Sequence, residues 1–296
     1  MSKRWLVTGA SGLLGHALCQ HLVSTGHEVT GVVHSHSLDV SGANEHKLDL
    51  LDGNVAADLV RKETYDVVVH CAGLTNVDAC ESDEEKAVQV HARVAKDLAK
   101  ACKEVGGKMV YISTDHLWDG SKPMVDEAEP ARPMNAYART KLEGERRVLI
   151  QNPESLVVRT NFFGPGRSWR ASLSDWIVTE LSQGHVIKAF TDVYFTPIGL
   201  SRLCPTIVDL VEQGAEGVFN VVGSERISKY EFAVRLAQKL DLSGDLIEKG
   251  SVSDARLGAP RPRDMSLTTD KISDFLNKPM PTIDECFDDL KINAIT

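Results

Sequence analysis

Long apolar runs are absent from this sequence. No uninterrupted stretch approaches the roughly 20 apolar residues that a helix needs to span a bilayer. The first apolar segment, which starts near Arg4, begins so early that no signal peptide fits before it. We therefore expect a cytoplasmic protein that makes no contact with a membrane.

Positive charge and paired cysteines are also scarce. The 33 Lys and Arg residues against 42 Asp and Glu residues give a net charge of −9 at pH 7, which argues against a broad nucleic-acid-binding surface. An anionic ligand must therefore be met by local cations. The six cysteines form no C-x-x-C pair and have no His cluster beside them, so we expect buried free thiols in a reducing compartment.

The rest of the composition is that of an ordinary globular protein. Hydrophobic residues make up 42% and charged residues 25% of the 296 positions. A chain of this length can bury a sizeable core. It has room for one large α/β domain, or for a nucleotide domain with a smaller companion.

The most informative stretch is a glycine-rich turn between a short apolar strand and an amphipathic helix. Gly9, Gly12 and Gly15 are spaced three apart. Gly9 permits a sharp turn, Gly12 lets the backbone approach a pyrophosphate, and Gly15 lets the helix pack closely on its strand. The pyrophosphate would lie at the positive end of the helix dipole, which predicts a dinucleotide site; the alternative is a loop that binds nothing. The residues expected there are Gly9, Ser11, Gly12, Leu13 and Leu14.

The second predicted strand, Glu28–Val33, ends in His34 and Ser35. A carboxylate at this position would accept hydrogen bonds from the adenosine ribose and repel a 2′-phosphate. Because the first acid, Asp39, comes several residues later, we expect NADPH as the cofactor, with NADH possible. His34 and Ser35 are the predicted contacts at this end.

Two further turns are candidates for cofactor contacts. Asp49 and Leu50 follow a short third strand, where the Asp either contacts the adenine or caps the helix that begins near Gly53. The buried strand Asp66–Cys71 leads into small residues that would let a nicotinamide ribose approach the backbone, although a plain strand-to-helix turn would have the same composition. The candidates in this second turn are Cys71, Ala72 and Gly73. A long helix, Asp83 to Val105, is expected next.

The chemistry is expected where the strand Lys108–Ser113 ends and a later helix begins. Tyr137 and Lys141 are four residues apart and share a helical face. A phenol titrates near ~10, and an ammonium one turn away would lower its pKa. Thr114, at the end of the strand, would bond to a substrate carbonyl. Taken alone, this Tyr and Lys spacing is more often that of an ordinary exposed helix pair. Its combination with the glycine-rich turn and with Thr114, 23 positions before Tyr137, favours the catalytic interpretation.

These motifs carry a family resemblance. The G-x-x-G-x-x-G spacing resembles the short-chain dehydrogenase/reductase superfamily. Residues 113–120 (S-T-D-H-L-W-D-G) and 133–145 (P-M-N-A-Y-A-R-T-K-L-E-G-E) resemble the dTDP-4-dehydrorhamnose reductase family within it, as do residues 192–197 and 260–267. The resemblance covers nearly the whole chain. It implies that Thr114, Tyr137 and Lys141 are catalytic, and that NADPH reduces the C4 ketone of a nucleotide-linked 4-keto-6-deoxysugar, as in dTDP-rhamnose biosynthesis.

The resemblance also implies the fold. We expect an α/β protein with a doubly wound parallel-sheet Rossmann domain formed by residues 1–165 and 187–222. Residues 166–186 and 223–296 would form a smaller substrate-binding lobe. The substrate contacts expected on this basis are Thr75, Asp115, Asn161, Phe162 and Arg261. Arg261 would bind the diphosphate, or it is simply solvated.

Several positions depart from the family pattern. His91 stands where the family generally carries an Asn tied to a proton relay, so its imidazole either relays protons or fills space. Asn161 and Phe162 occupy a stretch that often contains a Trp, which leaves the identity of the sugar open. Asp115-His116 replaces the Asp-Glu pair of sugar-nucleotide dehydratases, which disfavours dehydration. Ala17 replaces the metal-binding Glu of some members, so we expect no metal.

Two other functions fit the same residues. The Thr, Tyr and Lys set also serves epimerases that hold NAD tightly. The turn and the segment 258–263 resemble the non-catalytic, NADP-binding β subunit of methionine adenosyltransferase as well. We expect a monomer or homodimer that binds a nucleotide sugar and no nucleic acid.

Overall fold

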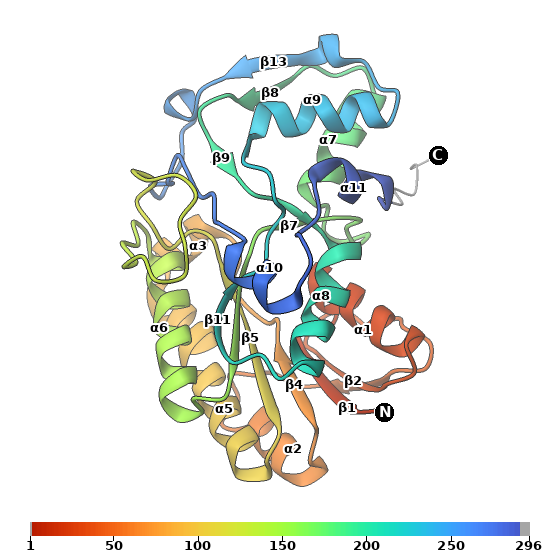
Figure 1. Cartoon of the computed structure of the whole chain (residues 1–296), viewed down its shortest axis with the longest axis vertical. Helices are drawn as coiled ribbons and strands as arrows, with labels where there is room; N and C mark the ends of the chain where they lie inside the picture. Colours follow the sequence, from red (N-terminus) through yellow and green to blue (C-terminus); the bar gives the residue numbers. More distant parts are fainter. Residues whose placement is uncertain (1, 291–296) are drawn as a thin grey trace.

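The computed structural model describes residues 2–290 and is organised around a seven-stranded parallel sheet (Figure 1). The strand order is β11-β6-β5-β4-β1-β2-β3, so the chain winds outward in one direction from β1 and in the other from β4. This confirms the predicted α/β fold with a doubly wound parallel sheet. The strands are Arg4–Thr8 (β1), Glu28–Val33 (β2), Asn44–Lys47 (β3), Val67–His70 (β4), Lys108–Thr114 (β5), Leu156–Thr160 (β6) and Gly217–Asn220 (β11).

Helices cover both faces of this sheet (Figure 1). Alternate side chains of β1 show why: Trp5 and Val7 pack with α1 and α8, whereas Leu6 packs with α2 and α5 on the other face. A strand buried on both sides has no polar face, which explains its continuous apolar run. The helices are Leu13–Ser24 (α1), Val55–Glu63 (α2), Val77–Ser82 (α3), Val94–Val105 (α5), Ala136–Gln151 (α6) and Leu200–Glu212 (α8).

The expected long helix between Asp83 and Val105 is not a continuous α-helix. It consists of α4 (Glu84–Val88), a π-helical turn (Gln89–Arg93) and α5. Asp83 caps α4 by accepting a hydrogen bond from the Lys86 N–H at 3.0 Å. The apolar periodicity continues through the π-helical turn, so this turn could not be predicted from the sequence. Such turns insert one extra residue into a helix and often lie at functional sites.

Most of the smaller elements gather beyond the carboxyl edge of the sheet (Figure 1), whereas α10 packs beside β11, with the ring centroids of Phe275 and Phe219 5.2 Å apart. Strand β8 pairs with β13 and strand β12 pairs with β9. The predicted division into two domains remains a prediction, but β8, which was expected in the Rossmann domain, pairs with a strand of the expected lobe. The elements are Phe162–Phe163 (β7), Leu173–Ser182 (α7), Ile187–Phe190 (β8), Tyr194–Phe195 (β9), Ile198–Gly199 (β10), Ile227–Ser228 (β12), Lys229–Lys239 (α9), Ile247–Gly250 (β13), Asp270–Leu276 (α10) and Ile283–Asp288 (α11).

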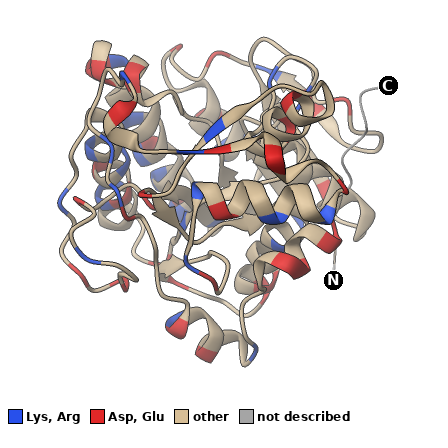
Figure 2. Ribbon diagram, turned by 90° about the horizontal axis from the view of Figure 1, so that it is seen from above, with Lys and Arg blue, Asp and Glu red and all other residues tan. Residues whose placement is uncertain are grey.

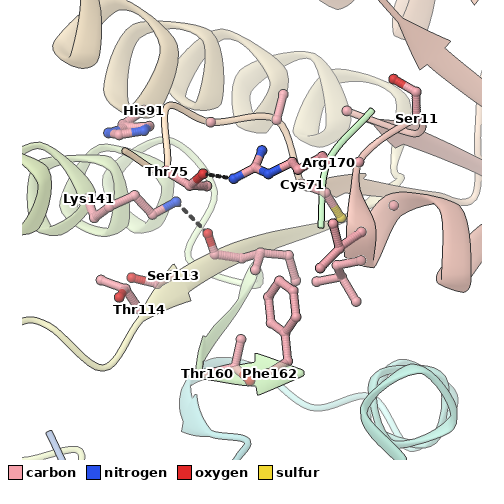
Figure 3. A pocket seen from close by; sticks show the side chains of 18 of the residues that line it. Ser11, Cys71, Thr75, His91, Ser113, Thr114, Lys141, Thr160, Phe162 and Arg170 are labelled. Atoms are coloured by element: carbon pink, nitrogen blue, oxygen red, sulfur yellow. Dashed lines mark hydrogen bonds between the residues drawn. The ribbon is translucent and has the colours of Figure 1, made fainter. Parts of the chain in front are cut away.

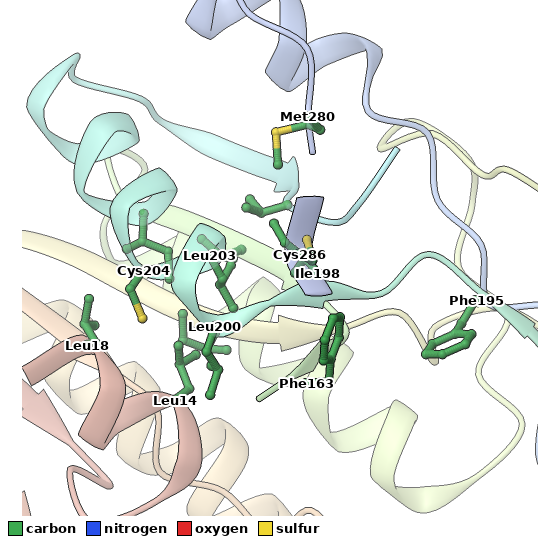
Figure 4. Close-up of a cluster of buried hydrophobic side chains, with 14 of the residues drawn as sticks. Leu14, Leu18, Phe163, Phe195, Ile198, Leu200, Leu203, Cys204, Met280 and Cys286 are labelled. Carbon is green, nitrogen blue, oxygen red and sulfur yellow. The ribbon is translucent and has the colours of Figure 1, made fainter. Parts of the chain in front are cut away.

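One hydrophobic core joins the two regions. Leu14 of α1 and Leu203 of α8 belong to the same buried cluster as Phe232 of α9 and Phe287 of α11. Phe163 lies at the junction, with ring centroids 5.0 Å from Phe232 and 5.4 Å from Phe287 in edge-to-face geometry. Figure 4 shows part of this cluster between α1, α8 and the C-terminal segments.

Charged residues are distributed over the outside of the molecule. In Figure 2, basic and acidic positions are interspersed along helices and loops without a large region of one sign. None of the helices within residues 2–290 combines the length and apolarity needed to cross a membrane.

We predict that Gly15→Ala destabilises the protein by about 2–3 kcal/mol. A Cβ at Gly15 would lie 2.8 Å from the Ala10 Cα and closer still to the Gly9 carbonyl oxygen, so α1 would have to move away from the turn. Gly244→Ala is the matched control, because a Cβ there meets nothing within 4 Å and should change stability by less than about 0.5 kcal/mol. Urea unfolding of the two variants tests this, and equal midpoints would contradict it.

Candidate active site

A cavity of about 560 Å³ lies at the carboxyl ends of β1, β4, β5 and β6 (Figure 3), where open parallel sheets bind ligands. It gathers most of the residues predicted from the sequence, although they come from segments far apart in the chain. The predicted residues that line it are Gly9, Ser11, Gly12, Leu13, Leu14, His34, Leu50, Cys71, Ala72, Gly73, Thr75, Thr114, Asp115, Tyr137, Lys141, Asn161 and Phe162.

Three predicted residues do not line the cavity. The Ser35 hydroxyl is 2.8 Å from Nδ1 of its neighbour His34. Asp49 accepts the Leu51 N–H at 2.9 Å, which makes a local turn and does not cap α2. Arg261 is paired with Asp78 at 3.0 Å and is only 18% exposed. This pairing connects the segment around residue 260 to α3, a contact that proximity in the sequence could not indicate.

The glycine-rich turn has the geometry of an anion site. Gly9 has φ +64°, and a Cβ there would lie 2.7 Å from the Ala72 nitrogen, so only glycine fits without strain. Gly12 is the N-cap of α1, no side chain caps the helix, and its first turn has no acid. The N–H groups and dipole of this helix end therefore face the cavity without a competing carboxylate, which fits a diphosphate.

Tyr137 is held in the first turn of α6. Asn135, the N-cap, accepts the Ala138 N–H at 2.9 Å and donates to the Pro260 carbonyl at 2.9 Å, so the start of the helix is fixed on two sides. The Tyr137 ring lies between two imidazoles, with centroids 5.7 Å from both His91 and His116 and nearly perpendicular planes.

The pKa of Tyr137 differs from the expected direction. Burial raises it to about 12; hydrogen bonding with Thr114 lowers it, and the charge of Asp115 raises it further. Lys141 is not among the groups that shift it. The sequence-based expectation that Lys141 lowers this pKa is therefore wrong for this structure, because burial outweighs the neighbouring charges. A protonated phenol at neutral pH is a proton donor.

Lys141 is directed at the end of β5. Its Nζ donates to the Ile112 carbonyl at 2.5 Å and lies 4.1 Å from the centre of the Tyr111 ring. Burial lowers the pKa of Lys141 to about 7, and the carboxylate of Glu145 opposes that shift. The ammonium is therefore easily titrated, unlike that of a solvated lysine.

A buried ion pair supports this end of the sheet. Arg159 of β6 donates to both carboxylate oxygens of Glu145, at 2.7 and 3.0 Å, and Ser113 donates to the same carboxylate at 2.5 Å. Both members of the pair are less than 8% exposed. Removing one partner would leave an uncompensated buried charge, so the pair fixes α6 relative to β5 and β6.

His91 has a structural role in the π-helical turn. The Leu74 N–H donates to its Nε2 at 3.0 Å, so the proton of the neutral ring is on Nδ1, which lies 2.8 Å from the Thr140 hydroxyl. Burial, followed by the charge of Lys141, lowers the pKa of His91 to about 2. Both nitrogens are engaged by the protein, which fits the space-filling role, and the proton-relay role stays a prediction.

The opposite wall carries a second polar group. Asp115 is 1% exposed and accepts a hydrogen bond from the Asn161 amide at 2.6 Å. Burial raises the pKa of Asp115 and lowers that of its neighbour His116. This wall contains no second carboxylate in the place of the dehydratase Glu.

A segment that we call the strap, Gly166–Arg170, closes one side of the cavity. Arg167 contacts His16 at 2.6 Å and Asp39 at 3.1 Å. Trp169 stacks on His36 with ring centroids 4.0 Å apart. Trp169 and Arg170 also line the cavity, and the sequence did not predict them because no motif or spacing marks them.

Within residues 2–290, no group of three or more His, Cys, Asp or Glu side chains is arranged to hold a metal ion.

The RmlD substrate-binding domain family matches residues 3–290. The chain belongs to this family. The resemblance to dTDP-4-dehydrorhamnose reductases that the sequence motifs indicated is thereby confirmed.

Two relatives illustrate the range of functions near this RmlD-family protein. It is 30% identical to the probable low-salt glycan biosynthesis reductase Agl14 of Haloferax volcanii, over 94% of each chain. It is 28% identical to methionine adenosyltransferase 2 subunit beta of Xenopus laevis, over 92% of this chain and 82% of that protein.

Solved structures agree with the fold of the RmlD-family protein. A hypothetical dTDP-4-dehydrorhamnose reductase from Sulfolobus tokodaii superimposes with a TM-score of 0.85 at 33% identity, covering 98% of this chain and 100% of that one. The dTDP-4-dehydrorhamnose reductase of Bacillus anthracis, solved in complex with NADP, has a TM-score of 0.83 at 23% identity, covering 97% and 98%.

We predict that His91 makes the RmlD-family protein acid-sensitive. Its folded pKa of about 2 lies below the unfolded value of 6.5, so the unfolded state binds the extra proton and stability falls as pH drops below 6.5. Between about pH 7 and about pH 5 this one group should cost about 2 kcal/mol. His91→Asn should remove that part of the pH dependence in urea unfolding.

The control for this experiment is His46→Asn, because His46 is exposed on β3 and its replacement should retain the wild-type pH dependence. If His91→Asn loses as much stability as the wild type between the two pH values, the buried neutral imidazole is not responsible.

Proposed function

We propose that this RmlD-family protein is a reductase that uses NADPH, with NADH as the alternative, to reduce the C4 ketone of a nucleotide-linked 4-keto-6-deoxysugar. One observation carries the proposal: Thr114, Tyr137 and Lys141 line the same cavity as the glycine-rich turn. The family match and the dTDP-4-dehydrorhamnose reductase relatives support it, and the NADP bound to the Bacillus anthracis relative agrees with the cofactor.

The residues of the cavity suit a dinucleotide. The diphosphate would bind at the uncapped start of α1, beside Gly12 and Leu13. Lys141 and Tyr137 would contact the nicotinamide ribose. The reduced nicotinamide would supply the hydride for the ketone carbon.

Side chains of the protein then orient the ketone and supply the proton. Thr114 orients the carbonyl by hydrogen bonding, and Tyr137 donates its proton to the oxygen on which negative charge develops. Burial keeps Tyr137 protonated at neutral pH, which suits an acid in the direction of reduction. Lys141 holds the ribose and supplies positive charge close to the reacting groups.

The similarity to methionine adenosyltransferase 2 subunit beta supports a second candidate, a non-catalytic NADP-binding subunit. Mixing the purified protein with NADPH and a set of 4-keto sugar nucleotides, while following the absorbance of the reduced nicotinamide, separates the two. Oxidation of NADPH with stoichiometric sugar reduction supports the reductase. Tight NADPH binding without turnover of any member of the set favours the subunit. A cofactor that stays bound to the protein through gel filtration, and that returns to its oxidised form in each catalytic cycle, would indicate an epimerase.

We predict that Tyr137→Phe lowers kcat by about 10²-fold or more, because the proton donor is lost. The affinity for NADPH should change little, since the ring and the cavity remain. Steady-state kinetics and fluorescence titration of NADPH measure the two quantities. Tyr230→Phe is the control, because Tyr230 lies on α9 away from the cavity. Full activity in Tyr137→Phe would refute the proposed role.

We predict an alkaline loss of kcat/KM for NADPH, a parameter that reports ionisations of the free protein. The pKa of Lys141 is about 7, so the ammonium is present below that pH and is lost above it. The parameter should be constant in acid and fall up to about tenfold per pH unit above about pH 7. Tyr137, with a pKa of about 12, adds no fall in this range. Lys141→Arg should abolish the fall, and a flat wild-type profile would contradict the assignment.

A further inference from the structure

The cavity contains few cations that are charged and available to a ligand. Burial lowers the pKa values of His91 and His116, so these rings are neutral at neutral pH. Lys141 donates to the Ile112 carbonyl and is assigned to the nicotinamide ribose under the proposed function. Among residues 2–290, Arg170 is the only arginine that lines the cavity. A chain with a net charge of −9 therefore presents one guanidinium to an anion that enters there.

Arg170 is also free of acidic partners. No carboxylate in the part of the chain that the structure describes lies within ion-pair distance of it, and its side chain bonds to the Thr75 hydroxyl. Figure 3 shows the Arg170 side chain directed toward Thr75 across the cavity. A neutral hydroxyl does not neutralise a guanidinium, so its preference for an anionic, bidentate partner remains unsatisfied.

The backbone that presents Arg170 is firmly anchored. Arg167 and Arg170 exchange backbone hydrogen bonds at 2.9 and 2.8 Å, which closes the strap into a turn. Asp175 of α7 accepts the Gly166 N–H at 2.7 Å and the Ser172 N–H at 2.8 Å, and so anchors the strap at its start and just beyond its end. The side chain of Arg170 is exposed on this fixed support, which allows it to exchange Thr75 for a ligand.

We propose that Arg170, positioned by the strap and by Thr75, binds the diphosphate of the nucleotide-linked substrate. This inference rests on the proposed function. The dinucleotide diphosphate has its own place at the start of α1, whereas Arg170 meets Thr75 on the segment that follows β4. Arg170, Thr75 and Tyr137 line the same cavity, so a diphosphate bound at Arg170 would belong to a substrate whose ketone can reach Tyr137.

Calorimetry can test this site without turnover. Thymidine diphosphate and uridine diphosphate are titrated into the protein saturated with NADP, with thymidine and uridine as phosphate-free counterparts. Arg170→Ala should weaken diphosphate binding about tenfold or more, because charge-assisted hydrogen bonds are lost. The nucleosides and NADP should bind as before. Arg170→Lys should give an intermediate loss of diphosphate affinity, since a lysine keeps the positive charge but lacks the paired N–H donors of a guanidinium.

The matched control is Arg132→Ala, which removes an exposed arginine outside the cavity and should leave every affinity unchanged. The inference is overturned if Arg170→Ala binds the diphosphates as tightly as the wild type, or if NADP binding falls by the same factor, which would assign the guanidinium to the cofactor. It is also overturned if neither diphosphate binds the wild type. Diphosphate binding without reduction of any ketone would overturn the proposed reductase alone.

Discussion

The close contact between α6 and the end of β5 is the constraint on which the site depends. Gly144 of α6 has no room for a side chain, because a Cβ would clash with the Tyr111 ring and the His91 carbonyl. The Glu145–Arg159 pair ties the same helix to β6. The positions of the Tyr137 and Lys141 side chains depend on this placement of α6. A helix that lay further from the sheet would carry both side chains away from Thr114 and the glycine-rich turn.

The same contact explains the unusual helix before β5. The π-helical turn at Gln89–Arg93 brings His91 to α6 and to the turn after β4, where it bonds to Thr140 and to the Leu74 N–H. An imidazole that is neutral, buried and doubly bonded joins three segments without a charge. The departure from the family pattern at this position is therefore compatible with an intact cavity, since the ring stabilises the turn that lines it.

The sequence predicted the features that depend on residues close together along the chain. The glycine-rich turn, the spacing of Tyr137 and Lys141 and the alternation of strands and helices are local, and the parallel sheet follows from them. Contacts between distant segments were not predictable: Arg170 reaches Thr75 across 95 positions, and Arg261 reaches Asp78 across 183. The raised pKa of Tyr137 was not predictable either. It results from burial, which depends on the whole fold and cannot be inferred from the four-residue spacing to Lys141.

The shared core has a consequence for how the protein is made. Leu14 lies in the first helix and Phe287 in the last described one, yet both fill one hydrophobic cluster. During synthesis the apolar face that α1 and α8 present cannot be fully covered until the ribosome has released the segment around residue 287. The apolar surface of α1 and α8 therefore stays partly uncovered until synthesis is nearly complete, and shielding by a chaperone would matter more for this fold than for one whose sheet domain closes on its own.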